Sequence, residues 1–363
     1  MKFSVIIPLY NKAPYARKAL ESICAQTCRD YELIVINDGS TDNSAIVADE
    51  YLKATDGIDY KIINQPNAGV SAARNNGVAA SHGEYVAFLD ADDWWEPTYL
   101  ERMAQLIEDY SDAGLYACNY VYYKPGKTHV ALKNIETGYI NYPKAYCEEG
   151  GMPVTSISVA IPRKVFDEMG GFPLGIKLGE DFLLWSKIAL QYPVAFLNEP
   201  LAWYNNDVPA TLRATRNLHA PEYHMLFRLD EVKGYRLEVK GNEEVKGSEN
   251  GEADTPASHL SPLNSKLTSD SVPTSRLLPL AYRQEDWHNL LDRLRVTGLM
   301  EYWLDKRYHD LAAEELKKVD WSKQPASVIR MYKTPRWLLK LKRNVMRVGS
   351  YVKQIMINIL KIK

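Results

Sequence analysis

Three features of the sequence predict an α/β fold with a Rossmann-like, mostly parallel sheet, flanking helices and a helical C-terminal extension. Short β-rich runs alternate with helical patterns over residues 1 to about 95, an order typical of parallel strands joined by helices. Polar or acidic clusters follow several of these runs, where α/β proteins bind ligands. The last part of the chain has a helical apolar pattern. The 363 residues suffice for one large domain with additions or for two domains.

The first part of the predicted sheet contains four strands. They are Phe3 to Leu9, Glu32 to Ile36, Tyr60 to Ile63 and Tyr85 to Leu89. Between the first two, apolar residues recur at close to the helical period from Pro14 to Thr27, and Pro14 suits the first helical position.

The next section, to about residue 215, is predicted to extend the same sheet. Its strand-like runs are Gly114 to Tyr123, Val154 to Ile161 and Val194 to Leu197, and its helix-like runs are Lys164 to Met169 and Phe182 to Leu190. We expect residues 216–320 to form a helical region, interrupted at residues 236–276. Gly, Ser, Asn, Glu and Pro dominate that segment, which predicts a disordered insertion.

Residues 321–363 are predicted to form a basic amphipathic helical tail. They contain 11 Lys or Arg and no Asp or Glu. Thr334 and Pro335 suit a helix start, and apolar residues follow at spacings of three and four from Leu338 to Ile362. Such a helix over 335–363 suits an anionic membrane surface, while a coiled-coil seam or packing against the protein's own body remain as alternatives.

Composition narrows the partners and the compartment. The formal net charge of −2 gives no strongly basic signature, so we expect no nucleic-acid partner. Four cysteines without a CxxC spacing favour a reduced setting. No run approaches 18 consecutive apolar residues, so a spanning helix is not expected. We therefore expect a cytoplasmic protein that is peripheral on the inner membrane face.

A cluster of carboxylates follows the fourth predicted strand. Asp90, Asp92 and Asp93 come directly after the apolar run Tyr85 to Leu89. Like charges repel, so such a cluster favours a bound cation, and carboxylates with substrate phosphates are natural ligands of a hard divalent ion. A solvated acidic loop is the alternative.

A second polar cluster, Asn37 to Ser40, follows the second predicted strand. Asp38 can accept hydrogen bonds from a base or a ribose, and Gly39 permits a tight turn. Taken alone, this segment is better explained as an ordinary turn.

Four motifs in sequence order resemble the family 2 glycosyltransferases, which have the GT-A fold. They are VIIPLYN from Val5, NDGSTD from Asn37, NAGVSAARNNG from Asn67 and FLDADD from Phe88. The similarity covers nearly all of residues 3–100 and continues more sparsely through Glu180 and Asp181. It implies a GT-A catalytic domain over 1–215, with a nucleotide-sugar-binding half at 1–100 and an acceptor-binding half at 101–215.

The resemblance also implies a donor site and a metal site. The DxD motif, Asp90 to Asp92, would hold Mn²⁺ or Mg²⁺ against the donor diphosphate, with Asp92 as the direct ligand. Residues that match the donor-binding positions of the family are Pro8, Tyr10, Asn11, Asp38, Arg74, Asp90 and Ala91. A histidine that completes the metal site in many relatives is missing, so either Asp207 replaces it or the metal lacks that ligand.

The catalytic base implied by the resemblance is Asp181, with Glu180 orienting the acceptor or the base. We expect the helix start at this pair to keep the base ionised. The alternative is that the pair only caps its helix.

The expected function is inverting transfer by a hexosyltransferase-type enzyme. The donor would be a nucleotide-diphosphate sugar, with a UDP-sugar expected, and the acceptor a glycan or lipid-linked glycan in surface polysaccharide biosynthesis. One alternative is a catalytically silent nucleotide-sugar-binding or scaffold subunit. The other is a sugar nucleotidyltransferase, which would want a Gly-rich phosphate loop that Tyr10 to Pro14 lacks.

Overall fold

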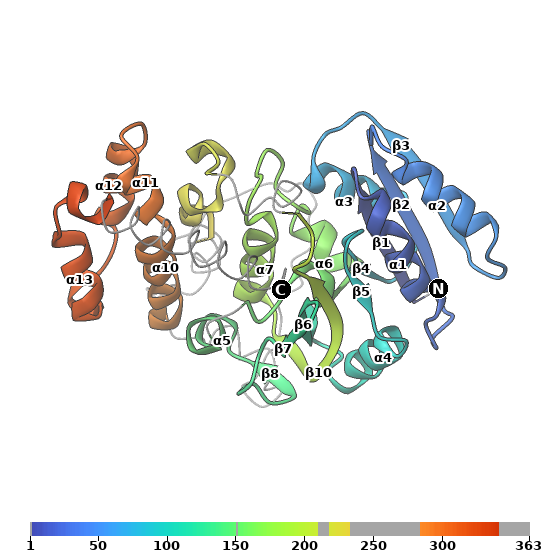
Figure 1. Cartoon of the computed structure of the whole chain (residues 1–363). Helices are drawn as coiled ribbons and strands as arrows, with labels where there is room; N and C mark the ends of the chain where they lie inside the picture. Colours follow the sequence, from blue (N-terminus) through green and yellow to red (C-terminus); the bar gives the residue numbers. More distant parts are fainter. Residues whose placement is uncertain (1, 150–151, 210–217, 233–283, 341–363) are drawn as a thin grey trace, which may run out of the picture. The chain divides into compact units, whose positions relative to one another are not determined.

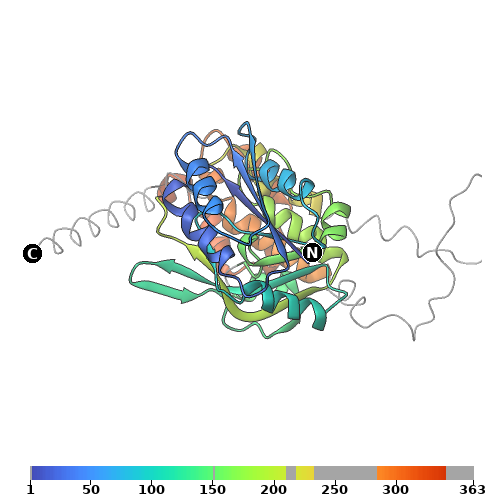
Figure 2. The same cartoon turned by 90° about the vertical axis from the view of Figure 1, so that its right-hand side faces the viewer.

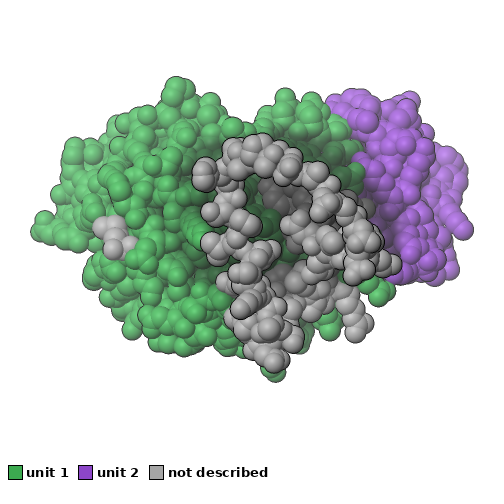
Figure 3. Space-filling view, turned by 180° about the vertical axis from the view of Figure 1, so that it is seen from behind, with its two compact units in different colours: residues 1–290 green, residues 291–363 purple. Residues whose placement is uncertain are grey.

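The computed structural model describes residues 2–149, 152–209, 218–232 and 284–340. Two compact units divide the chain, residues 1–290 and residues 291–363 (Figure 3). The predicted insertion at 236–276 and the part of the predicted tail beyond residue 340 lie outside the described residues.

The first unit is built around one ten-stranded sheet (Figure 1). Its strands are β1 (Phe3–Leu9), β2 (Tyr31–Asp38), β3 (Tyr60–Gln65), β4 (Tyr85–Phe88), β5 (Trp94–Trp95), β6 (Leu115–Lys124), β7 (Lys127–Val130), β8 (Gly138–Ile140), β9 (Val159–Pro162) and β10 (Val194–Asn205). The strand order is β3-β2-β1-β4-β9-β6-β10-β5, with β7 on β6 and β8 on β10. Figure 2 shows the β6–β7 hairpin extending from the unit. The α/β fold class is confirmed.

The four strands predicted first are all present and pair in parallel. β1 lies between β2 and β4, with Phe3 opposite both Tyr31 and Tyr85, and β3 pairs with β2. All eight residues of β2 are buried, as expected for a central strand of a parallel sheet.

The rest of the sheet is mixed. β9 runs antiparallel to β4 and β6, β10 runs parallel to β6, and β5 pairs antiparallel with β10. The strand predicted from Val154 is shorter than expected, because residues 156–158 form a short 3₁₀ helix before β9. Apolar runs reveal burial but not strand direction, so the pattern alone could not distinguish these pairings.

The helices of the first unit connect and cover these strands (Figure 1). α1 packs beside α2, and α3 packs against β1 and β2. A Cβ added at Gly77 of α3 would lie 2.4 Å from Cγ2 of Ile6, so this glycine permits the close approach of helix and sheet. The helices are α1 (Ala13–Cys24), α2 (Ser44–Lys53), α3 (Val70–Ala79), α4 (Tyr99–Asp109), α5 (Tyr142–Glu149), α6 (Arg163–Glu168) and α7 (Glu180–Gln191), with 3₁₀ helices η1 (Ser156–Ser158), η4 (Pro221–Tyr223) and η5 (Met225–Phe227).

The described part of the second unit, up to residue 340, is helical. It begins within α10 (Gln284–Gly298) and continues through α11 (Met300–Leu304), α12 (His309–Lys317), η7 (Trp321–Lys323) and α13 (Ala326–Lys333). A further helical segment at 336–340 follows Thr334 and Pro335, at the predicted helix start. None of the helices in the described parts of the chain is long and apolar enough to cross a membrane.

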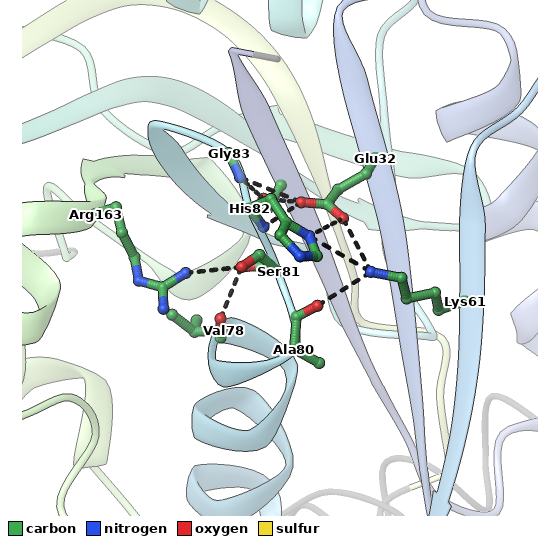
Figure 4. Close-up of polar contacts among 9 residues, drawn as sticks. Glu32, Lys61, Val78, Ala80, Ser81, His82, Gly83 and Arg163 are labelled. Carbon is green, nitrogen blue, oxygen red and sulfur yellow. Dashed lines mark hydrogen bonds and ion pairs between the residues drawn. The ribbon is translucent and has the colours of Figure 1, made fainter.

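A buried carboxylate, Glu32, joins β1 and β2 to the turn before β4 (Figure 4). It accepts hydrogen bonds from the Ser4 hydroxyl (2.8 Å) and the Gly83 main-chain N–H (3.2 Å), and the Lys61 ammonium lies 3.6 Å away. Burial would raise the pKa of Glu32, but hydrogen bonds from His82 and Ser4, with the charge of Lys61, outweigh burial and lower it. The ionised carboxylate therefore stabilises the folded chain.

We predict that Glu32→Gln lowers the free energy of unfolding by about 1–3 kcal/mol, because the amide cannot satisfy every buried donor around it. Urea denaturation at neutral pH measures this loss. The pKa of Glu32 is lowered in the folded state. The extra free energy of unfolding of the wild type over the variant is therefore complete above the unfolded pKa of about 4.3, and it is lost as the pH falls through the folded pKa. Glu50→Gln on the exposed surface of α2 is the control, and equal midpoints for the two variants would contradict the assignment.

Candidate active site

The predicted site residues of the first half gather at the carboxyl ends of β1, β2 and β4. The chain leaves β1 toward β2 on one side, and β4 lies on the other side. In parallel α/β sheets such a switch in strand order opens a crevice for ligands. The register sets Leu9 beside Asn37 and Ile6 beside Phe88, so the segments after all three strands emerge at this edge.

The loop after β1 is fastened to the turn after β2. Asn11 has a positive φ of 50°, and its side-chain oxygen accepts a hydrogen bond from the Thr41 main-chain N–H (2.8 Å). Gly39 has a φ of 70°, and a Cβ there would lie 2.8 Å from the main-chain nitrogen of Asn67. The tight turn expected at Gly39 is therefore present.

Asp38 holds the loop that precedes α3. Its carboxylate accepts hydrogen bonds from the main-chain N–H groups of Ala68 (2.8 Å) and Gly69 (2.9 Å) and from the Gln65 side chain (2.7 Å). This carboxylate thus orders a loop in addition to any contact with a nucleoside, which stays a prediction.

Two further predicted nucleoside contacts, Pro8 and Tyr10, lie at the same edge. Pro8 is half-buried in β1, opposite Ile36, and Tyr10 directly after the strand is 46% exposed. Tyr10 is therefore accessible to a ligand at this end of the sheet.

Arg74 joins the acidic residues of the two halves. Its guanidinium is buried and donates to Asp90 Oδ1 (2.7 Å) and to Glu180 Oε1 (3.0 Å). The ring of Phe172 lies 5.0 Å from the guanidinium carbon. The sequence predicts a nucleoside contact for Arg74, and the structure reveals in addition this double ion pair, which brings Asp90 and Glu180 together.

The remaining residues of the acidic segment have separate partners. Asp92 Oδ2 lies 2.5 Å from the Lys12 ammonium. Asp93 is buried and accepts a hydrogen bond from the Asn205 main-chain N–H (2.7 Å), which fixes the end of β10 beside the segment. Ala91 is also buried. Sequence reasoning missed Lys12, although it directly follows Asn11 in the first motif, and Asp93 as an anchor of β10.

The carboxylates of this segment are held in an environment of excess negative charge. Burial raises the pKa of Asp92 despite the opposing charge of Lys12. Burial and the neighbouring Asp92 and Asp90 raise the pKa of Asp93 well above its ordinary value. A bound divalent cation would relieve this repulsion.

Glu180 and Asp181 open α7, as the sequence predicts. The residue before them, Gly179, has a φ of 86°, and a Cβ there would lie 2.4 Å from Cγ of Met225. The Phe182 main-chain N–H donates to Asp181 Oδ1 (2.7 Å). The glycine therefore lets the chain turn sharply into the helix while residue 225 packs against it.

The helix start does not keep Asp181 fully ionised at neutral pH, contrary to the expectation from the sequence. Burial, followed by the charge of Glu180, raises the pKa to about 7, and the opposing charge of Arg74 offsets this only in part. A favourable helix terminus contributes too little to overcome desolvation of this carboxylate.

The chemistry of the side chains fits a divalent cation. Mg²⁺ is commonly held by one or two carboxylates, with substrate phosphates and water as further ligands, and Asp90 and Asp92 provide such carboxylates. In the described part of the chain, no group of three or more His, Cys, Asp or Glu is arranged to hold a metal alone. Asp207 lies exposed in a turn after β10, and its role as a replacement ligand stays a prediction.

We predict that Arg74→Met lowers the free energy of unfolding by about 3–5 kcal/mol, because it leaves two partly buried carboxylates without their buried cation. Chemical denaturation measures the loss, and adding Glu180→Gln should recover part of it. Arg17→Met, which breaks an exposed pair with Glu21, is the control and should cost about 0.5 kcal/mol or less. A loss no larger than that of the control would contradict the double ion pair.

Comparison with known proteins finds a matching family and several relatives. Residues 4–170 match the family model described as glycosyl transferase family 2. EpsH of Bacillus subtilis is 40% identical over 145 residues, which are 39% of this chain and 40% of that protein. Glycosyltransferase GlyA of Streptococcus pneumoniae is 35% identical over 217 residues, which are 56% of this chain and 30% of that protein. The chain thus spans less than half the length of these curated relatives.

Solved structures show the same fold. A crystal structure of S. aureus TarS 1–349 in complex with UDP-GlcNAc has a TM-score of 0.57 and 17% identity, over 88% of this chain and 89% of that chain. The structure of TarS 1–349 in complex with UDP has a TM-score of 0.52 and 16% identity, with the same coverage. Residues 4–170 therefore match the family 2 glycosyltransferases, and the fold of the chain is of the GT-A type.

Proposed function

We propose that the chain is an inverting glycosyltransferase that moves a sugar from a nucleotide-diphosphate donor to a glycan acceptor. The observation that carries the proposal is the double ion pair of Arg74, which joins Asp90 of the donor half to Glu180 of the acceptor half. A transferase needs the donor diphosphate and the acceptor hydroxyl at one place, and these carboxylates meet there.

The donor proposed is a UDP-sugar. The TarS structures in complex with UDP-GlcNAc and with UDP support this class of donor for the shared fold. Pro8, Tyr10, Asn11 and Asp38 would contact the nucleoside, and Asp90, Ala91 and Asp92 would lie beside the diphosphate. Mn²⁺ or Mg²⁺ bound at Asp92 and Asp90 would supply charge stabilisation for the departing diphosphate.

Asp181 would act as the general base. The acceptor hydroxyl oxygen forms a bond to the anomeric carbon from the face opposite the diphosphate, its proton passes to the Asp181 carboxylate, and the bond from carbon to diphosphate oxygen breaks. This displacement inverts the anomeric configuration. Glu180, fixed by Arg74, would orient the acceptor or the base. A pKa of about 7 suits a base that works near neutral pH.

Aromatic side chains next to the acidic segment support a glycan as the acceptor. Burial and then the charges of Asp93, Asp90 and Asp92 raise the pKa of Tyr204, which places this ring near the carboxylates. Tyr122 packs edge-to-face on Tyr204 at 5.5 Å between ring centroids. Rings of this kind offer an apolar face and a hydroxyl to a sugar.

We predict that kcat/KM rises with pH through about 7 and then levels, because only the deprotonated Asp181 can accept the acceptor's proton.

We also predict that Asp181→Asn lowers the rate of transfer by roughly 10² to 10⁴ while donor binding is kept. The rate at which UDP is released from the UDP-sugar donor measures the pH profile of the wild type and the loss of transfer in the variant. Asp167→Asn, on the exposed surface of α6, is the control, and full activity of Asp181→Asn would place the base elsewhere.

We further propose that residues 335–363 bind an anionic membrane surface, which would bring the chain to lipid-linked acceptors in surface polysaccharide biosynthesis. In the described part of this segment, Arg336 and Lys340 lie on either side of Trp337, which is 68% exposed. Basic residues near an exposed tryptophan suit a lipid interface.

We predict that replacing Lys340, Lys342, Arg343 and Arg347 together by Gln weakens binding to anionic vesicles by roughly a thousandfold, at about 1 kcal/mol for each charge. Co-sedimentation of the full chain with anionic and neutral vesicles measures this. Equal pelleting of the wild type and the variant with anionic vesicles would remove the membrane proposal.

A further inference from the structure

A lysine from the loop after β1 occupies the carboxylate that the proposed metal would use. The Lys12 ammonium lies 2.5 Å from Asp92 Oδ2, and the two side chains are only 16% and 17% exposed. The main chain of Lys12 is fixed at the start of α1, because its N–H donates to the Ser44 hydroxyl (2.7 Å). The main chain of Lys12 is therefore fixed, and its flexible side chain carries the ammonium to the acidic segment.

The two carboxylates of the DxD motif differ in how firmly their cations are held. Asp90 pairs with the buried guanidinium of Arg74, which is also anchored by Glu180. Asp92 pairs with Lys12, whose ammonium is a compact charge at the end of a flexible four-carbon side chain. Arg74 is held by two carboxylates, whereas the Lys12 ammonium lies at the end of a flexible side chain, so the pair of Lys12 and Asp92 is the more readily exchanged of the two.

A divalent cation and an ammonium compete for the same carboxylate oxygen, since close like charges repel strongly. If the cation takes Asp92, the Lys12 ammonium needs another anion within reach. The donor diphosphate, bound at the same edge of the sheet, supplies that anion and prefers cationic partners.

We propose that Lys12 is an exchangeable counter-cation that holds Asp92 before the donor arrives and passes to the donor diphosphate when a divalent cation binds Asp92. The inference rests on the proposed function and adds a donor-binding residue to it. It makes metal and nucleotide binding cooperative, because each ligand then removes the obstacle to the other.

Binding of Mn²⁺ and UDP to the full chain tests this inference. Free Mn²⁺ is followed by electron paramagnetic resonance, and UDP binding by calorimetry with saturating Mn²⁺. Lys12→Met should bind Mn²⁺ alone about tenfold more tightly and Mn²⁺-UDP about tenfold more weakly than the wild type, and Lys12→Arg should stay close to the wild type. Adding Asp92→Asn to Lys12→Met should abolish the gain in Mn²⁺ affinity.

Lys53→Met serves as the matched control, because Lys53 pairs with Asp49 on the exposed surface of α2. This variant should leave the affinities for Mn²⁺ and for Mn²⁺-UDP unchanged. Circular dichroism checks that each variant is folded. If Lys12→Met binds Mn²⁺-UDP as tightly as the wild type does, and binds Mn²⁺ alone no more tightly than the wild type, the inference is overturned and the proposed function is left intact. Failure of the wild type to bind any UDP in the presence of Mn²⁺ would overturn both.

Discussion

The candidate site depends on the buried guanidinium of Arg74. Two carboxylates that are more than 80 residues apart in the sequence, Asp90 and Glu180, share this one cation. An unpaired buried charge is costly, so the buried guanidinium depends on these two carboxylates as they depend on it. The guanidinium can reach both because α3 lies close to the sheet, where Gly77 leaves room for Ile6.

The sheet supports this arrangement from both ends of its first four strands. At their amino ends, Glu32 holds β1 and β2 to the turn before β4. At their carboxyl ends, Asp38 holds the loop before α3, so the same helix that carries Arg74 begins at a fixed point. Asp93 then ties β10 to the acidic segment. Each end is fixed by a buried carboxylate that accepts main-chain hydrogen bonds. Breaking these hydrogen bonds is costly, because it would leave buried N–H donors unsatisfied.

The sequence alone could predict the elements whose signals are local. The run from Phe3 to Leu9 begins and ends as predicted, and Gly39 adopts the positive φ that its turn requires. The direction of β9 and the length of β10 could not be predicted, because they depend on pairing between distant segments. The same limit applies to the site. The motifs predict Asp92 as a metal ligand and Asp181 as the base, but the pair with Lys12 and the raised pKa of Asp181 arise from burial and charges that only the folded chain brings together.

The most direct test of the account is the thermal stability of the full chain with a panel of nucleoside diphosphates and nucleotide sugars, each with and without Mn²⁺. A ligand at 100 times its Kd stabilises the folded state by about 2.7 kcal/mol, which is readily measured as a rise in Tm. The account predicts a Mn²⁺-dependent rise with UDP and with one UDP-sugar. No rise with any nucleotide in the panel would contradict the proposed donor site.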